Sequence, residues 1–324
     1  MAIGRINFIK CEAGRRGRTE DNMQVDLWGN EIIPDVLLRD KFIEPPFSVL
    51  DTKSGNWQRR KREWLRKGIK SEIGRDEDLT YKGNVKDYDY YRVKEGKKEK
   101  SDSQSTSIFD PALCELMYKW FCNDGGKILD PFAGGSVRGI VAHYLKYYYV
   151  GIELRQEQVD ANRENAAEIL PVNNQPSWHV GDSDTILDDD FLYEFDMVFS
   201  CPPYMDLEVY SDDENDLSNM TDDNFIEKYK SIIKKSCSKL KKDGYAVFVV
   251  GDVRDKKTGF YKDFISITKQ AFYDAGMGLY NDAILLNPVA SASMRAGKVF
   301  EAGGKLTKIH QNILVFKRGK DAAP

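Results

Sequence analysis

The chain has 324 residues, 41% of them hydrophobic, and a formal net charge of −4. This length suits one large α/β domain with an appendage, or two small domains, and the hydrophobic content is sufficient for a sizeable core. No apolar run approaches about twenty residues and no signal-peptide pattern is present, so we expect neither a membrane protein nor an exported one. The five cysteines are Cys11, Cys114, Cys122, Cys201 and Cys237. Their spacing fits neither a disulfide framework nor a zinc site, which indicates the reducing cytoplasm.

The first hundred residues carry clustered basic side chains. Residues 1–44 are weakly patterned and suggest a mobile basic arm, with Arg15, Arg16 and Arg18. Residues 57–75 include eight basic and two acidic residues, and this local excess of positive charge is suited to binding phosphate groups. Trp57 and Trp64 interleave with these charges and could add stacking, although a solvated helix with its apolar side on the core explains the same pattern. The candidate DNA contacts here are Arg59, Arg60, Lys61, Arg62 and Arg66.

A polar, lysine-rich and tyrosine-rich stretch, residues 76–104, follows and reads as a long loop or linker. We therefore expect a basic N-terminal extension over residues 1–104 and a second domain over residues 105–324. The second domain opens with a helix that runs to Phe121, with Pro111 in its first turn. Phe109, just before this helix, can act as a hydrophobic staple.

Three predicted strands in succession end in acidic residues. Residues 126–139 read as a short strand, a glycine turn and the start of a helix, and the glycines let the backbone approach a ligand closely. Glu153 ends the next strand, 23 positions after Asp130, where a carboxylate can accept both hydroxyl groups of a ribose. Asp182 ends the third strand, where it could accept from an adenine amino group. The pattern indicates an adenosine pocket.

A fourth apolar run, residues 195–199, leads directly into Ser200-Cys201-Pro202-Pro203-Tyr204. Two successive prolines cannot donate backbone hydrogen bonds and fix the backbone in a stiff extended corner with its carbonyls exposed. The carbonyls offer acceptors and Tyr204 offers a flat π-face, which suits a planar ring with an exocyclic amino group. Taken alone, such a corner is more often ordinary strand-to-loop punctuation.

The remainder of the chain predicts a lid, core elements and a basic loop. Residues 205–223 are acidic and aperiodic, as in a loop over an active site. Apolar residues then recur at helical spacing to Leu240, before a strand over 245–250. Asp252 and Arg254 at the tip of this strand favour a surface salt bridge, and their place at the same edge as Tyr204 keeps them as candidate site residues. The last two strands, 279–286 and 312–317, flank a long glycine-rich loop over 290–311, and its basic residues Arg295, Lys298 and Lys305 are further candidate DNA contacts.

In this order, the motifs resemble those of the S-adenosylmethionine-dependent DNA amino methyltransferases, which act on adenine N6 or cytosine N4. More closely, the chain is similar to a phage and prophage subset of DNA methylases, with FDPALCELMYKWF-like, CPPYMDLEVYSDD-like and KLTKIHQNILVFK-like stretches; the resemblance covers most of the chain from Phe47 onward. It implies an α/β, Rossmann-like class I fold with a seven-stranded, mostly parallel sheet and one antiparallel strand. The cofactor-binding residues that it implies are Phe109, Asp130, Pro131, Phe132, Gly134, Gly135, Glu153 and Asp182, and the catalytic ones are Ser200, Cys201, Pro202, Pro203 and Tyr204.

Two residues depart from the pattern of this family. Ser136 stands where the last turn glycine is usual, which would shift the methionine end of the cofactor. Cys201 replaces Ser, Asn or Asp, and a thiol is a weak donor and acceptor. We therefore expect main-chain carbonyls of Cys201 and Pro202 to hold the amine, with Ser200 as a helper.

The chemistry implied needs positioning and acceptors, with no metal or covalent intermediate, and no HExxH or paired CxxC motif is present. The expected substrate is double-stranded DNA, with adenine N6 favoured over cytosine N4 as the methylated atom. The oligomeric state is open between a monomer and a homodimer. No room is left for a large recognition domain between the two motif groups, so target recognition falls to the N-terminal hundred residues and the 205–223 and 290–311 loops. An RNA or protein-amide methyltransferase and a catalytically silent DNA-binding protein are the remaining hypotheses.

Overall fold

The computed structural model describes residues 35–69, 109–189, 194–205, 216–255, 257–287, 289 and 292–318. The chain divides into two compact units between Pro45 and Pro46. In its described part, the first unit consists of helix α1 (Asp35–Phe42) and the few residues that follow it. The predicted basic arm at Arg15–Arg18, the predicted linker 76–104 and the domain boundary near residue 104 lie outside the described residues, so that boundary stays a prediction.

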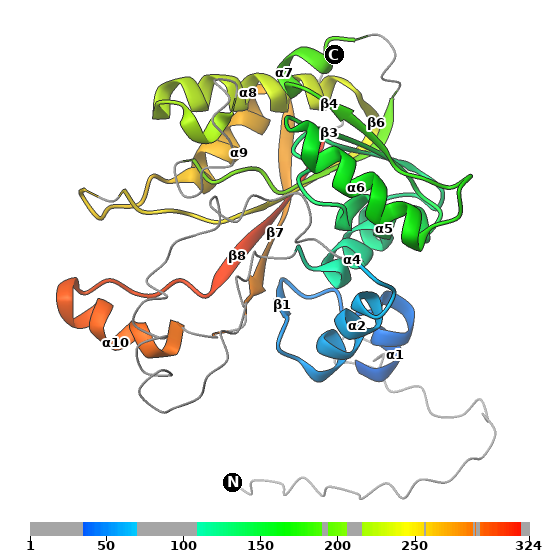
Figure 1. Ribbon diagram of the computed structural model, residues 1–324. Coiled ribbons are helices and arrows are strands. Elements are labelled where there is room, and N and C mark those ends of the chain that lie inside the picture. The colour runs from blue at the N-terminus through cyan, green and yellow to red at the C-terminus, as the bar shows by residue number, and fades with distance from the viewer. Residues whose placement is uncertain are drawn as a thin grey trace, which may run out of the picture. The chain divides into compact units, whose positions relative to one another are not determined.

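An eight-stranded sheet forms the centre of the second unit (Figure 1). Its strand order is β1-β7-β8-β6-β5-β2-β3-β4, and β8 runs antiparallel to both of its neighbours while the other pairs are parallel. The predicted mostly parallel α/β sheet with one antiparallel strand is thus confirmed, and β1 adds an eighth, short edge strand. The strands are β1 (Val49–Asp51), β2 (Lys127–Asp130), β3 (Tyr148–Glu153), β4 (Ser177–Val180), β5 (Phe195–Ser200), β6 (Leu240–Val250), β7 (Met277–Leu286) and β8 (His310–Arg318).

Helices cover both faces of this sheet: α4, α5 and α6 lie on one face, and α8 and α9 lie on the other (Figure 1). This alternation of strand and helix around a parallel sheet is what buries both of its faces. The helices of the second unit are α2 (Gly55–Leu65), α4 (Pro111–Phe121), α5 (Val137–Tyr144), α6 (Gln156–Ile169), α7 (Ser183–Ile186), α8 (Asp222–Ser238), α9 (Phe264–Asp274) and α10 (Ala292–Gly303), with a short 3-10 turn η2 (Leu217–Asn219).

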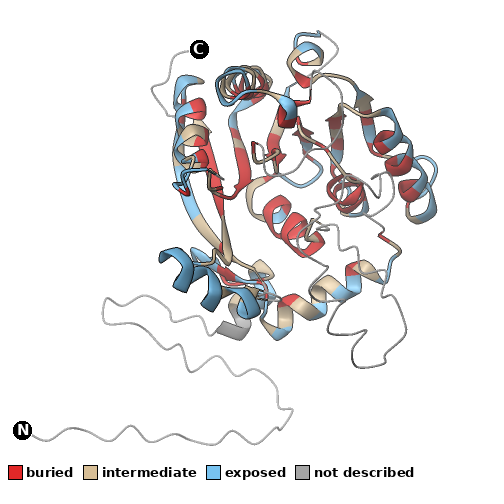
Figure 2. Ribbon diagram, turned by 60° about the vertical axis from the view of Figure 1, so that its left-hand side comes forward, coloured by how far each residue is buried: buried red, intermediate tan, exposed pale blue. Residues whose placement is uncertain are grey.

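The core follows the hydrophobic periods of the sequence. In α8, the buried residues Phe225, Tyr229, Ile232 and Ile233 repeat at helical spacing, and the Thr221 side chain caps the first turn. They pack on the sheet in the large apolar cluster that also contains β5 and β6 side chains, and Figure 2 colours much of the central strands as buried. The predicted helix over this segment is therefore confirmed as a core element.

Helix α4 begins where the sequence predicted. The Asp110 side chain accepts a hydrogen bond from Ala112 N at 3.0 Å, and Pro111 occupies the first helical turn, where its missing N–H costs nothing. The aromatic ring of Phe109, immediately before this cap, packs on Phe199 at the end of β5 with 5.8 Å between ring centroids. The helix entry thereby brings Phe109 to the carboxyl end of the sheet.

The strand order reverses between β2 and β5, because β3 and β4 extend the sheet on one side while β6 lies on the other. Ligands of open α/β sheets bind in the crevice at the carboxyl ends of the strands at such a point. The glycine turn follows β2 and the proline corner follows β5, so the fold places the two principal motifs next to one another across this crevice.

The segment between the last two strands differs from its prediction. Residues 292–303, expected as part of a glycine-rich loop, form helix α10, which lies beyond the ends of β7 and β8, away from α8 and α9 (Figure 1). None of its described side chains is buried. Glycine lowers helix propensity by about 1 kcal/mol, and Gly297 in the helix interior weakened the helical signal.

Within the described ranges, every helix is too short or too polar to cross a bilayer.

Candidate active site

A cavity of about 640 Å³ opens at the carboxyl ends of the strands, between the glycine turn after β2 and the corner after β5. This volume is in the range of small-molecule and cofactor sites. Most of the predicted site residues line it: Phe109, Pro131, Phe132, Gly134, Gly135, Glu153, Asp182, Cys201, Pro202, Pro203 and Tyr204. The two groups of residues that were assigned to the cofactor and to the base therefore share one continuous space.

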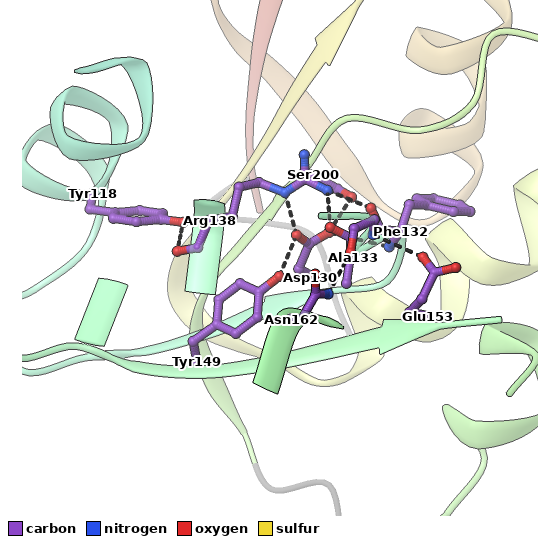
Figure 3. Close-up of polar contacts among 10 residues, drawn as sticks. Tyr118, Asp130, Phe132, Ala133, Arg138, Tyr149, Glu153, Asn162 and Ser200 are labelled. Carbon is purple, nitrogen blue, oxygen red and sulfur yellow. Dashed lines mark hydrogen bonds and ion pairs between the residues drawn. The ribbon is translucent and has the colours of Figure 1, made fainter. Parts of the chain in front are cut away.

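Beneath the cavity, a buried arginine organises the glycine turn (Figure 3). Arg138 Nε donates to Asp130 Oδ2 at 2.5 Å, and Nη2 donates to the carbonyl oxygens of Phe132 at 2.5 Å and Ala133 at 2.7 Å. Burial lowers the pKa of Arg138, but the Asp130 carboxylate more than offsets this, so the pKa is raised and the charge is retained. The sequence reasoning missed Arg138, whose only signal was a charged residue inside an otherwise apolar helix start.

Asp130 and Ser200 lie under the cavity rather than in its wall. Asp130 is 0% exposed and also accepts from Tyr149 OH at 2.7 Å and from Ser200 Oγ at 2.5 Å. The Ser200 hydroxyl thus joins the end of β5 to the end of β2. Their predicted roles, contact with the cofactor for Asp130 and with the amine for Ser200, do not match these positions, because both polar groups are enclosed by protein; they hold the turn and the corner in place.

Glu153 stands at the cavity end of β3 and holds the turn from the other side. Its Oε2 accepts from Gly134 N at 2.9 Å, where the backbone has φ +51°, and its Oε1 accepts from Arg155 N at 3.2 Å. Burial raises the pKa of Glu153, and the nearby Arg155 guanidinium opposes that rise. Each oxygen retains a lone pair for a further donor, so the carboxylate can accept hydroxyl groups from a ligand in the cavity.

Asp182 caps a short helix and carries an ion pair as well as facing the cavity. Its Oδ1 accepts from Asp184 N at 3.0 Å, and its Oδ2 lies 2.9 Å from Lys228 Nζ on α8. The predicted place at the cavity wall is confirmed, but the partners were not foreseen. Because the lysine and the cap engage both oxygens, Asp182 is oriented before any ligand arrives.

The corner after β5 presents a ring held from several sides. Tyr204 OH accepts from Gln311 Nε2 at 2.6 Å and donates to the Val249 carbonyl oxygen at 3.4 Å. The ring packs on Phe264 in an edge-to-face arrangement with 6.0 Å between centroids, and Cys201 Sγ lies 3.5 Å from the same hydroxyl. The sequence placed Gln311 only at the end of a predicted loop. It reaches the Tyr204 hydroxyl because β8, which contains it, lies next to β6.

Phe109 forms part of the cavity wall between the two motifs. The guanidinium carbon of Arg138 lies 4.7 Å from its ring centroid, on the side of the glycine turn. Of the two predicted roles, an aromatic wall fits this position, and no contact with the first turn of α4 is needed to explain it.

The basic segment on α2 differs in part from its prediction. Trp57 and Trp64 are buried and donate to Asp110 Oδ2 at 3.1 Å and to Glu115 Oε2 at 2.8 Å, so the proposal that they stack on bases is wrong. Arg60 forms a bidentate pair with Glu115, at 2.8 and 2.6 Å. The exposed cations are Arg59, Arg62, Arg66 and Lys67, while Lys61 lines the cavity. Lys70 and Arg75 lie outside the described residues.

Two further charged groups have partners other than those predicted. Asp252 Oδ1 accepts from Phe264 N at 3.1 Å at the start of α9, and Arg254 lies over the Tyr261 ring at 3.8 Å. These contacts, and not a salt bridge between the two, hold the described side chains, and Asp252 also lines the cavity together with Tyr204. On α10, Arg295 and Lys298 are exposed, as is Lys305 after it. Among the described residues, no cluster of histidine, cysteine or acidic side chains is arranged to hold a metal ion.

One family model matches part of the chain. Residues 41–164 match the model N6_N4_Mtase, described as DNA methylase. The matched segment contains α2, α4, the glycine turn and Glu153. No curated protein sequence matches the chain.

Solved structures with a similar fold include TrmN from Thermus thermophilus, with 12% identity and a TM-score of 0.45 over 65% of this chain and 49% of that one. The chain thus spans about half the length of that protein. Magnesium protoporphyrin IX methyltransferase (ChlM) from Synechocystis PCC 6803 with bound SAM has 12% identity and a TM-score of 0.41, over 73% of this chain and 93% of that one.

Proposed function

We propose that this protein transfers a methyl group to an exocyclic amino group in double-stranded DNA, with adenine N6 ahead of cytosine N4. The observation that carries the proposal is the single cavity that runs from Gly134 and Glu153 to the Tyr204 ring. A methyl donor held at the turn and a base held at the corner would share one cavity, which is the positioning that this reaction requires. The family match supports the substrate class.

The residues at the turn suit S-adenosylmethionine. The Glu153 carboxylate would accept the ribose hydroxyl groups, Asp182 would face the adenine, and the backbone of Gly134 and Gly135 would allow close approach, while Pro131, Phe132 and Phe109 would supply apolar contact. When bound, the cofactor supplies a methyl group already activated by its sulfonium. Asp130 contributes through Arg138 and Ser200, by fixing the turn.

The corner would hold the target base. A base must leave the duplex to reach a buried site, at a cost of a few kcal/mol, and stacking on Tyr204 would offset roughly 1–3 kcal/mol of it. The main-chain carbonyls of Cys201 and Pro202 would accept the amine protons and localise the nitrogen lone pair, so the nitrogen becomes a better nucleophile. Pro203 keeps the corner rigid, because its φ is fixed.

Duplex contact would come from exposed cations on two elements. These are Arg59 and Arg62 on α2 with Arg66 directly after it, and Arg295, Lys298 and Lys305 on and after α10. We propose the same role for the N-terminal extension that precedes the catalytic part, with target recognition shared by it, the 205–223 segment and α10. Residues 206–215 of that segment lie outside the described residues.

The experiment that tests this proposal weighs the product. Duplex DNA is incubated with the protein and methyl-labelled S-adenosylmethionine, digested to nucleosides and analysed by mass spectrometry, with structured RNA and a glutamine-containing protein in parallel. We expect label in N6-methyldeoxyadenosine; label in N4-methyldeoxycytidine would keep the reaction and reverse the order of bases. Label confined to RNA or protein, or DNA binding without any label, would refute the proposal.

A further inference from the structure

An ion pair from the N-terminal segment forms part of the cavity wall. Lys61 Nζ on α2 lies 3.2 Å from Asp110 Oδ2, and both residues line the cavity next to Phe109. Lys61 was assigned to phosphate contact on sequence grounds, yet its side chain turns away from the exposed side of α2 that carries Arg62 and Arg66. A lysine that faces the cavity indicates a role toward the ligand inside it.

Both members of this pair are held in place by the protein. Asp110 Oδ2 also accepts from the buried Trp57 Nε1 at 3.1 Å, and Oδ1 accepts from Ala112 N at 3.0 Å. Two carboxylate oxygens provide about four acceptor positions, of which these contacts use three, and an ammonium group has three N–H donors, of which Lys61 directs one at Asp110. The pair can therefore bind a further cation at Asp110 and a further anion at Lys61.

Its place in the cavity is the junction between the two motifs. Phe109, the residue before Asp110, contacts Arg138 of the glycine turn on one side and Phe199 of β5 on the other. Glu153 and Asp182 stand at the ends of β3 and β4, and the sheet order puts those strands beyond β2, on the side away from β5. A ligand whose ribose lies on Glu153 and whose reacting atom faces the corner would thus direct its remaining part toward Lys61 and Asp110.

The arginines of the cavity wall already have partners in the protein. Arg138 directs Nε and Nη2 at Asp130 and at two carbonyl oxygens, and Arg155 pairs with Glu153 and Glu157. Lys308 lies farther along the wall, 5.8 Å from the ring centroid of Tyr261 on the loop before α9. Lys61 is thus the cation best placed for a carboxylate near Phe109.

We propose that Lys61 and Asp110 form the receptor for the amino-acid end of S-adenosylmethionine, with Lys61 binding its α-carboxylate and Asp110 its α-ammonium. The proposal rests on the cofactor placement of the proposed function. A paired ammonium and carboxylate complement a zwitterion charge for charge, and charge-assisted hydrogen bonds are the stronger ones. The N-terminal helix α2 then completes the cofactor site, in addition to any contact with DNA.

The test compares two ligands that differ only at this end. S-adenosylhomocysteine carries the zwitterion, and 5′-methylthioadenosine has the same adenosine and thioether without it. Binding of both to the full chain is measured by calorimetry for the wild type, Lys61→Met, Lys61→Arg and, as the matched control on the exposed side of α2, Arg62→Met. Binding to a duplex of mixed sequence is measured alongside.

We expect Lys61→Met to lower the affinity for S-adenosylhomocysteine by about tenfold or more and the affinity for 5′-methylthioadenosine by less than about twofold. Lys61→Arg should recover most of the lost affinity. Arg62→Met should leave both ligands unchanged. Unchanged S-adenosylhomocysteine binding in Lys61→Met, equal losses for both ligands, or a loss confined to DNA would each overturn the inference. A wild-type chain that binds neither ligand would instead remove the cofactor placement itself.

Discussion

At the scale of single residues, Tyr204 carries the proposed reaction. Its hydroxyl bonds to Gln311 and Val249 and its ring packs on Phe264, so the position of the ring in the cavity wall is set before a base arrives. Loss of the ring removes roughly 1–3 kcal/mol of stacking together with the alignment of the amine. We predict that Tyr204→Ala lowers methyl transfer at least about 100-fold while S-adenosylhomocysteine binding stays within about twofold.

The matched variant Tyr204→Phe separates the ring from its hydroxyl. It keeps the stacking face and loses the two hydrogen bonds, so transfer should fall by less than about tenfold. Single-turnover assays and calorimetry measure both quantities. Tyr204→Ala with wild-type turnover would contradict the assignment of the corner.

Glu153 gives the cofactor site a pH dependence. Burial raises its pKa above the ordinary 4.5, so the folded chain takes up a proton at a higher pH than the unfolded chain does. Its ionised form therefore costs stability at neutral pH, and the ionised form is the one that accepts ribose hydroxyl groups. We predict that S-adenosylhomocysteine affinity falls as pH drops through the raised pKa, which lies above 4.5.

Calorimetry across pH measures this loss of affinity, and Glu153→Gln is its control. The amide has one acceptor oxygen and does not titrate, so the variant should bind more weakly at neutral pH with a flatter profile. A wild-type profile that is flat down to pH values below the ordinary one would count against Glu153 as a ligand of the ribose.

Arg138 is the residue on which the stability of the turn depends. Its removal would leave the Asp130 carboxylate, which is 0% exposed, without its counter-charge, and such a loss typically costs about 3–5 kcal/mol. We predict a fall of that size in the free energy of unfolding for Arg138→Met in urea. Arg59→Met, which breaks an exposed pair with Glu63, should cost less than about 1 kcal/mol; equal effects would show that the buried pair is not the cause.

At the scale of elements, we expect substitution of two glycines inside helices to change the free energy of unfolding in different ways. A Cβ at Gly139 of α5 would meet Trp178 Cζ2 at 2.6 Å, whereas a Cβ at Gly297 of α10 would meet nothing within 4 Å. Helix propensity favours alanine by about 1 kcal/mol at both positions, but overpacking costs about 1–3 kcal/mol at the first. Gly139→Ala should therefore lower the free energy of unfolding and Gly297→Ala should raise it or leave it unchanged; the reverse order in urea melts would contradict the packing of α5 on β4.

The same contrast explains which elements were predictable. The strands that end in Asp130 and Ser200 and the helix through Tyr229 follow from local hydrophobic periods and caps, so they lie close to their predicted bounds. Helix α10 was read as a loop because it contains glycine and has no buried face to give it a period. Burial on the partner element, as for Trp57 and Trp64 against α4, cannot be read from local composition.

At the scale of the whole molecule, the site is assembled from segments far apart in the chain. The sequence order of the motifs predicted the cavity and most of its wall, because parallel strands bring their carboxyl ends to one edge. Arg138 and Gln311 were missed, since their roles depend on contacts with Asp130 and Tyr204 that only the folded chain makes. The ion pair of Lys61 with Asp110 was not predicted for the same reason. The positions of the predicted motifs were therefore accessible from sequence, and their supporting contacts were not.

Charge placement across the molecule predicts the salt dependence of DNA binding. If Arg295 and Lys298 on α10 each contact a phosphate, the double variant Arg295→Ala/Lys298→Ala should reduce the slope of log K against log salt by about 2. The control Lys230→Ala/Lys234→Ala removes two cations from α8, which lies away from α10 in Figure 1, and should leave the slope unchanged. Equal slopes for wild type and the α10 variant would remove this helix from the interface.

A structure of the chain with bound S-adenosylhomocysteine would show whether donor and acceptor share one cavity. We expect the ribose on Glu153, the amino-acid end on Lys61 and Asp110, and the sulfur atom turned toward the corner at Tyr204. A ligand bound outside this cavity, or one whose sulfur faces away from the corner, would contradict this expectation.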